Sequence, residues 1–183
     1  MVANVKLVPG LMMLAWLALS STALAQNTPK LNVTSSAFAA GATIPVTYSC
    51  KSPNEQSPPL SWTGVPSDAK SLILILKDPD APNGTFIHWV IYNLPTSVSG
   101  LEANVPRTAK LANGGMQGVN SLGKIGYMGP CPPPGSPPHH YHFELSALDT
   151  ALSIKPDATA AQVEEAAQGH VKADGDLVGT FAR

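Results

Sequence analysis

Two clusters of polar residues, far apart in the sequence, hold the side chains that could do chemistry. The first is the run 78–82 (Asp-Pro-Asp-Ala-Pro), followed by His88. The second is the run 129–135 (Gly-Pro-Cys-Pro-Pro-Pro-Gly), followed by His139 and Tyr141. Proline fixes its own φ and restricts the residue before it, so both runs hold nearby side chains in a preset geometry. Carboxylates, imidazoles and a phenol held in this way predict a small, rigid, polar binding or catalytic site.

The two carboxylates of the first cluster are expected to act together. Asp78 and Asp80 are separated by a single residue, and in an extended segment such residues point to the same face. Close, partly buried carboxylates cannot both ionise freely, so one of them is expected to hold a proton near neutral pH. The alternative for either aspartate is a cap or an Asx turn at the end of a strand.

The histidines fall on segments with a strand-like alternation. Residues 86–94 form one such segment, and strict alternation places Phe86, His88, Val90 and Tyr92 on one face and Ile87, Trp89 and Ile91 on the other. A lone histidine in an apolar strand is more often a buried core residue than a ligand. His139 and Tyr141 share one face of a later strand and favour a site, whereas His140 and His142 point to its opposite face and are expected to be structural or surface groups.

These stretches, in this order and at this spacing, resemble the phosphatidylethanolamine-binding proteins, also called Raf kinase inhibitor-like proteins, and within that family the exported bacterial branch. The resemblance runs from about residue 31 to about residue 150. The matching stretches are 57–62 with Gly64, 77–82, 88–90 with 93–95, 129–133 with Gly135, and 139–141.

The resemblance implies a small cavity that holds phosphate-like anions or phospholipid head groups. The matching positions are Asp78, Asp80, His88, Gly129, Pro130, Cys131, His139 and Tyr141. Imidazole N–H groups, the tyrosine hydroxyl and backbone N–H groups of the 129–131 turn are donors that suit phosphate oxygens. The carboxylates accommodate an anion only if a proton is shared with it, so binding is expected to be favoured at mildly acidic pH. This chain has His140 where the family usually has Arg. Whether residue 140 forms the salt bridge of that Arg is therefore left undecided by the sequence.

The N-terminus predicts export. Residues 1–25 contain one cation, Lys6, no acid, an apolar core at 11–19 and small residues leading to Ala25, which is the pattern of a secretory signal cleaved after Ala25. The apolar core is shorter than the ~20 residues of a membrane-spanning helix. We therefore expect residues 26–183 to form one periplasmic or secreted domain without stable membrane insertion. Gln26 rather than Cys follows the cleavage position, so a lipid anchor is not expected.

Cysteine count and charge restrict the partners. Cys50 and Cys131 are the chain's 2 cysteines, and an even pair in an oxidising compartment predicts a disulfide. A metal site would need more Cys or His nearby, and a redox pair would usually be Cys-x-x-Cys. The chain has no basic run and no basic amphipathic helix, which disfavours nucleic acid and anionic membrane surfaces as partners.

The fold is predicted to be mainly β. Proline and glycine separate short runs rich in Val, Ile, Thr and aromatic residues, as in sandwiches and barrels. Residues 72–76 and 177–181 are further strands, and 160–168 is a helix with a Thr159/Gln162 capping box and Gly169 as its stop. We predict a single-domain antiparallel Greek-key β-sandwich with one or two peripheral helices.

Three functions are compatible with these residues. The first is an exported, non-enzymatic binding protein for small anionic or phosphorylated ligands that also modulates partner proteins. The second is a hydrolase or metal-dependent enzyme that uses the Asp/His cluster. The third is a protein-interaction module with a vestigial pocket. The sequence has no Gly-x-Ser-x-Gly elbow, no metal-ligand spacing at the cluster and no cofactor fingerprint, so we expect no catalysis, no metal and no cofactor. A protein partner and a second copy of the chain, covering the pocket mouth, are the other expected partners.

Overall fold

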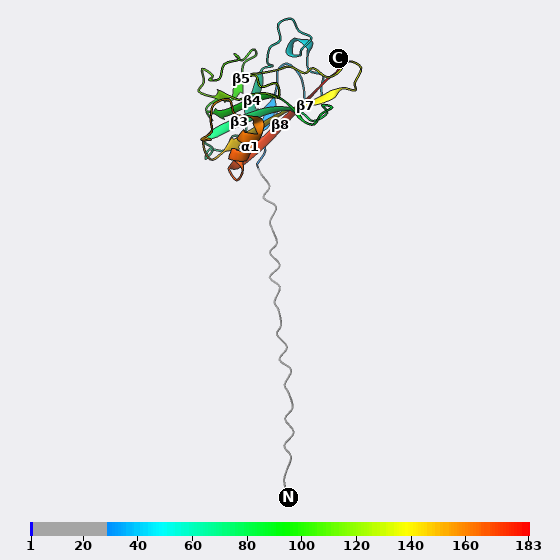
Figure 1. Cartoon of the computed structure of the whole chain (residues 1–183). Coiled ribbons are helices and arrows are strands. Elements are labelled where there is room, and N and C mark those ends of the chain that lie inside the picture. Colours follow the sequence, from blue (N-terminus) through cyan, green and yellow to red (C-terminus); the bar gives the residue numbers. More distant parts are fainter. Residues whose placement is uncertain (2–28) are drawn as a thin grey trace.

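Two antiparallel sheets form the body of the protein (Figure 1). The structure is a computed structural model that describes Met1 and residues 29–183, so the predicted signal segment and its cleavage position lie outside the described residues. The smaller sheet has the order β1-β2-β5, formed by Asn32–Thr34, Leu60–Thr63 and Gly100–Leu101. The larger has the order β6-β4-β3-β7-β8, formed by Met116–Gln117, Phe86–Leu94, Ser71–Asp78, His139–Leu148 and Val171–Phe181. The predicted mainly β sandwich is confirmed.

Strand β3 is continuously apolar because it is paired with β4 and β7 and covered on both faces. Leu72, Leu74 and Leu76 point into the main core between the two sheets, whereas Ile73 and Ile75 point to the opposite face. Fully burying a Leu or Ile side chain contributes about 1.5–3 kcal/mol, so this strand is a major source of stability.

The single α-helix among the described residues, α1 (Ala160–Ala167), covers part of the outer face of the larger sheet (Figure 1). Thr159 and Gln162 form the predicted capping box, and the buried side chains Ala160, Val163 and Ala167 pack against that face. Gly169 has a φ of 78° and ends the helix in the left-handed conformation that glycine adopts without strain. A 3-10 turn, η1 (Val46–Tyr48), is the other helical element within residues 29–183. No helix among residues 29–183 is long and apolar enough to cross a membrane.

The last strand is longer than predicted, because β8 begins at Val171 rather than at residue 177. Its first half is rich in Ala, Asp and Gly, which have low strand propensity. Pairing with β7 over ten positions, from His139↔Phe181 to Leu148↔Val171, outweighs that propensity.

A shift in strand register corrects the predicted faces of β4. Leu76 of β3 pairs with Trp89, but the next residue, Lys77, pairs with Ile87, so β4 has one extra residue at His88. Val90 belongs to the cluster on the outer face together with Ile87, and Trp89 belongs to the inner core. Strict alternation would place His88 with Val90 on the outer face. The bulge instead turns His88 inward, where its ring contacts that of Tyr141 at a centroid distance of 5.3 Å.

Gln117 of β6 fixes the indole next to this bulge. It accepts a hydrogen bond from Trp89 Nε1 at 2.6 Å, and its side-chain amide donates to the carbonyl oxygens of Pro106 and Thr108. All of these polar groups are thereby satisfied although Gln117 is fully buried.

Candidate ligand-binding site

A pocket of about 170 Å³ lies where β3 ends and where β4 and β7 begin. Its position follows from the order of the strands, because these three are neighbours in the larger sheet. It is a mostly apolar pocket with three buried titratable groups. Its lining residues are Asp78, Ala81, Pro82, Phe86, His88, Met128, Cys131, Pro132, Pro133 and His139.

Asp78 and His139 form a buried pair at the floor of this pocket. Their side chains are only 4% and 6% exposed, and His139 Nδ1 lies 2.8 Å from Asp78 Oδ2. Asp78 Oδ1 accepts the backbone N–H of Asp80 at 2.9 Å. Both carboxylate oxygens are therefore hydrogen-bonded. The Nε2 atom of His139 has no partner among the described residues and is the nitrogen left for a ligand.

His88 is fixed by two hydrogen bonds to one residue. Its Nδ1 donates to the carbonyl oxygen of Met128 at 2.9 Å, and the N–H of Met128 donates to the carbonyl oxygen of His88 at 3.0 Å. Burial lowers the pKa of His88 below its ordinary value, although the nearby carboxylate of Asp78 acts in the opposite direction. Neutral His88 therefore presents an unprotonated Nε2, which lies 4.0 Å from Asp78 Oδ2.

The hydroxyl of Tyr141 is the one buried side-chain polar atom without a hydrogen-bond partner among residues 29–183. Burial is the main cause that raises the pKa of this phenol, and the Asp78 carboxylate raises it further. Tyr141 therefore remains a neutral O–H group. Tyr141 does not itself line the pocket, but its ring contacts that of His88, which does. A buried donor without an acceptor is costly, and a bound water would remove that cost.

The loop 129–131 supports the pocket wall from behind. Cys131 lines the pocket and forms the predicted disulfide with Cys50, with a Cα–Cα distance of 5.4 Å. The N–H of Cys50 donates to the carbonyl oxygen of Pro130. Gly129 lies against the neighbouring segment so closely that a Cβ atom would stand 2.5 Å from the carbonyl oxygen of Tyr48. Gly129 and Pro130 are buried and position this wall, but they do not line the pocket.

Asp80 does not join the pocket, and the expected carboxylate pair does not form. The chain leaves the extended conformation after Asp78 and turns at Pro79, so the side chain of Asp80 points outward and is 41% exposed. Its Oδ2 accepts both the backbone N–H of His140 at 2.7 Å and the His140 ring nitrogen Nδ1 at 2.8 Å. The hydrogen bond from the His140 side chain lowers the pKa of Asp80. The sequence left open whether residue 140 forms a salt bridge. In the structure, His140 pairs with Asp80.

The site predicted from sequence lacked several of the lining residues, and two of these, Phe86 and Met128, contact His88. Phe86 lines the pocket and its ring lies 4.8 Å from that of His88. The alternation along 86–94 already placed it beside His88, so a signal for it existed. Met128 contributes through its backbone, and the amino-acid type of a residue does not reveal such a role.

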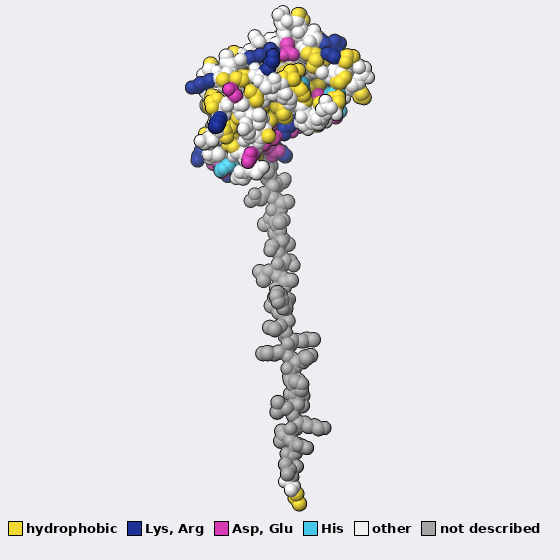
Figure 2. Space-filling model, in the orientation of Figure 1, with side chains coloured by type: hydrophobic (Ala, Val, Ile, Leu, Met, Phe, Trp, Pro, Cys, Tyr) yellow, Lys and Arg dark blue, Asp and Glu magenta, His cyan; other side chains and the backbone are white. Residues whose placement is uncertain are grey.

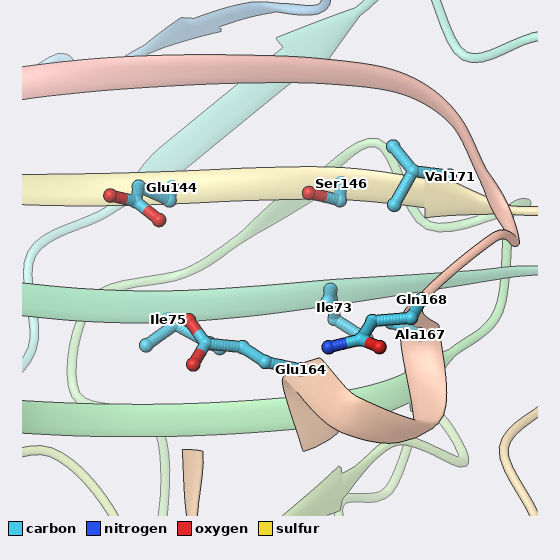
Figure 3. A pocket seen from close by; sticks show the side chains of 8 residues that line it. All are labelled: Ile73, Ile75, Glu144, Ser146, Glu164, Ala167, Gln168 and Val171. Atoms are coloured by element: carbon cyan, nitrogen blue, oxygen red, sulfur yellow. The ribbon is translucent and has the colours of Figure 1, made fainter. Parts of the chain in front are cut away.

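A second hollow, of about 180 Å³, lies under α1 on the outer face of the larger sheet (Figure 3). Ile73 and Ile75 form its floor, with Glu144 of β7 and Glu164 of α1 at one end (Figure 3). Both carboxylates already bind Lys77 Nζ at 2.7 Å. It offers no buried, unpartnered polar group, so the Asp78–His139 pocket is the better candidate site.

The charges of the surface are mixed. The chain has 11 Lys and Arg against 12 Asp and Glu, and on the face drawn in Figure 2 the two signs are interspersed among the described residues. Residues 29–183 include no group of three or more His, Cys, Asp or Glu side chains that could hold one metal ion.

Comparison with known proteins agrees with this fold. The family model described as phosphatidylethanolamine-binding protein matches residues 34–182. A UPF0098 protein of Methanothermobacter thermautotrophicus is 48% identical over 153 residues, which are 84% of this chain and 99% of that protein. A Mycobacterium tuberculosis protein named as a lipoprotein, LppC, is 41% identical over 152 residues, 82% of this chain and 72% of that protein. The crystal structure of CT736, a phosphatidylethanolamine-binding protein homologue from Chlamydia trachomatis, has a TM-score of 0.75 and 42% identity, covering 85% of this chain and 99% of that one.

Proposed function

We propose that this chain, which belongs to the phosphatidylethanolamine-binding protein family, is an exported, non-enzymatic binding protein whose pocket holds a small phosphate-like anion or phospholipid head group. The observation that supports this most directly is an imidazole nitrogen without a partner at the pocket. Nε2 of His139, which lines the pocket, makes no hydrogen bond among the described residues, and next to it the buried hydroxyl of Tyr141 makes none either.

The protonation of the pocket determines what it can bind. The pocket places the acidic side chain of Asp78 beside His88, whose neutral form is favoured by burial, so it disfavours a fully ionised phosphate. One added proton, on His88 Nε2 or on a ligand oxygen next to Asp78, changes repulsion into a hydrogen bond. Because burial lowers the pKa of His88, its protonated form gains population only as the pH falls below the ordinary histidine range. We therefore expect anion affinity to rise as the pH falls below about 6.5.

The absence of catalysis is proposed on the same geometry. The Tyr141 phenol is held neutral, because burial raises its pKa, and is a poor nucleophile. Cys131 is bound in the disulfide. The wall is built of Pro82, Pro132 and Pro133, and the disulfide anchors it, so no segment of the pocket resembles a closing lid.

Export to the periplasm or beyond the cell has two supports. One relative is named as a lipoprotein, and an exported protein would fit that name. The disulfide between Cys50 and Cys131 requires an oxidising compartment to persist. Cleavage after Ala25 would be tested by the N-terminal mass of the protein recovered from the periplasm.

A protein partner or a second copy of the chain at the pocket mouth remains part of this proposal, and light scattering with and without ligand would detect the second copy.

Calorimetry with inorganic phosphate and phosphorylethanolamine tests the binding function. His139→Ala should weaken binding roughly ten- to a hundredfold, because a charge-assisted hydrogen bond contributes about 1.5–3 kcal/mol. His142→Ala is the matched control, since His142 lies on the same strand but faces outward, and its variant should bind as the parent does. Equal losses in the two variants would show that the pocket is not the binding site. Hydrolysis of phosphoesters, esters or peptides that disappears in Asp78→Asn, with binding retained, would replace the binding function by an enzymatic one.

A further inference from the structure

Two exposed histidines lie next to each other on the outward face of β7. His140 and His142 are two residues apart in the strand, so their side chains share one face. The rise of about 3.3 Å per residue in a strand places their Cα atoms about 7 Å apart. The side chains are 55% and 30% exposed. Two imidazoles at this spacing on a fixed strand can converge on one ion.

Each of the two rings is oriented by a carboxylate through the same nitrogen. His140 Nδ1 lies 2.8 Å from Asp80 Oδ2, and His142 Nδ1 lies 2.7 Å from Asp176 Oδ2. With Nδ1 donating to a carboxylate, the neutral imidazole keeps its lone pair on Nε2. Neither Nε2 has a hydrogen-bond partner among residues 29–183. Metal-ligating histidines in proteins are held in this way, and the carboxylate also makes the free nitrogen more basic.

We propose that His140 and His142 form a surface site for a divalent transition-metal ion, bound through their two Nε2 atoms. Imidazole nitrogen suits Cu²⁺, Ni²⁺ and Zn²⁺, and the general order of stability favours Cu²⁺. Two protein ligands leave the other positions to water, so this is an open, exchangeable site and not a structural one.

The charges around the pair are compatible with a cation. Asp80 reaches it from the turn after β3, and Asp176 from β8. Lys77 is the register partner of His142 on β3, and it is the cation nearest in the sheet. Its ammonium group is directed to Glu144 and Glu164, at 2.7 Å from each. The remaining neighbours across the sheet, Val178 and Thr180, carry no charge.

This site is separate from the anion pocket. His139 and Tyr141 point inward from the same strand, and His140 and His142 point to the opposite side of the sheet. The metal proposal therefore does not depend on the proposed anion binding, and either can fail alone.

The test is a Cu²⁺ titration of the protein purified without a histidine tag, followed by electron paramagnetic resonance and by competition with a chelator. We expect one bound ion with two equivalent imidazole nitrogens in the spectrum. His140→Ala and His142→Ala should each weaken Cu²⁺ binding at least about tenfold, because each removes one of two ligands. Asp176→Ala, which keeps both ligands, should weaken it by about tenfold through loss of ring orientation.

His170→Ala is the matched control. His170 is also exposed, at 46%, and its Nδ1 also lies 2.8 Å from a carboxylate, that of Asp149, but the chain has no histidine two residues away on either side. Its replacement should leave Cu²⁺ affinity unchanged. The proposal is overturned if the spectrum shows a single nitrogen, if His140→Ala and His142→Ala bind Cu²⁺ as the parent does, or if His170→Ala loses as much as they do. Each variant's unfolding midpoint is measured first, and a variant that is not folded is replaced by the corresponding Asn variant.

Discussion

The two faces of strand β7 contain the same chemical groups in opposite surroundings. On the inner face, His139 pairs with Asp78 in a site from which water is nearly excluded. On the outer face, His140 and His142 pair with Asp80 and Asp176 at similar distances, but in contact with solvent. A buried pair cannot exchange its partner for water, whereas an exposed pair can do so at little cost. The comparison shows that burial, and not the identity of the pair, determines which histidines are fixed and which are open to an ion.

Removal of the inner carboxylate is the strongest test of this difference. Asp78→Ala should destabilise the fold by about 3–5 kcal/mol, because it leaves the N–H groups of His139 and Asp80 without their acceptor in a buried site. Asp176→Ala, its counterpart on the outer face, should cost less than about 1 kcal/mol. Urea unfolding of the two variants measures both values. Similar losses would contradict the distinction between the faces.

The disulfide should affect the two faces unequally. Replacing both Cys50 and Cys131 by Ser should cost about 2–4 kcal/mol, because the bond closes a long loop. Anion binding should weaken as well, since Cys131 is part of the pocket wall. Cu²⁺ binding at the outer face should not change. A double variant that loses Cu²⁺ affinity while still folded would show that the two sites are coupled.

The buried His88 should make the free energy of unfolding depend on pH. Its pKa is lowered in the folded protein by burial, so between that value and the unfolded value of about 6.5 the unfolded chain binds more protons. The stabilising contribution is complete above about pH 6.5 and is lost as the pH falls through the lowered pKa, with a slope of up to about 1.4 kcal/mol per pH unit. Unfolding of the parent and of His88→Gln at several pH values measures the difference. Parallel pH profiles would mean that His88 titrates normally.

The exposed Asp80–His140 pair should give the smallest effect. The His140 side chain lowers the pKa of Asp80 through a hydrogen bond, so any stabilisation by this pair disappears only as the pH falls through that lowered value. The pair is exposed, and its removal in His140→Ala should be barely measurable as a change in stability at neutral pH. An NMR titration should instead show the carboxyl resonance of Asp80 moving to a higher pKa in the variant. An unchanged titration would exclude the pair in solution.

Local patterns in the sequence were sufficient for much of the molecule. The capping box at Thr159 and Gln162 predicted the start of α1, and Gly169 predicted its end. The even pair of cysteines predicted the disulfide. The proline-bounded clusters also indicated a pocket, and Asp78, His88 and His139 all line it. In each case the information is contained in a few neighbouring residues or in a residue type, so no knowledge of strand pairing was needed.

The direction of individual side chains was decided only by the tertiary structure. Alternation along β4 could not reveal the extra residue at His88, because a bulge is a property of two paired strands and not of one. Asp80 was expected beside Asp78, but the turn at Pro79 directs it to His140, which lies 60 positions later in the chain. The sequence by itself determined which groups gather at this end of the sandwich. The register between β3, β4 and β7 decided which of them face the pocket and which face water, because a shift of one residue moves a side chain to the other face of a sheet.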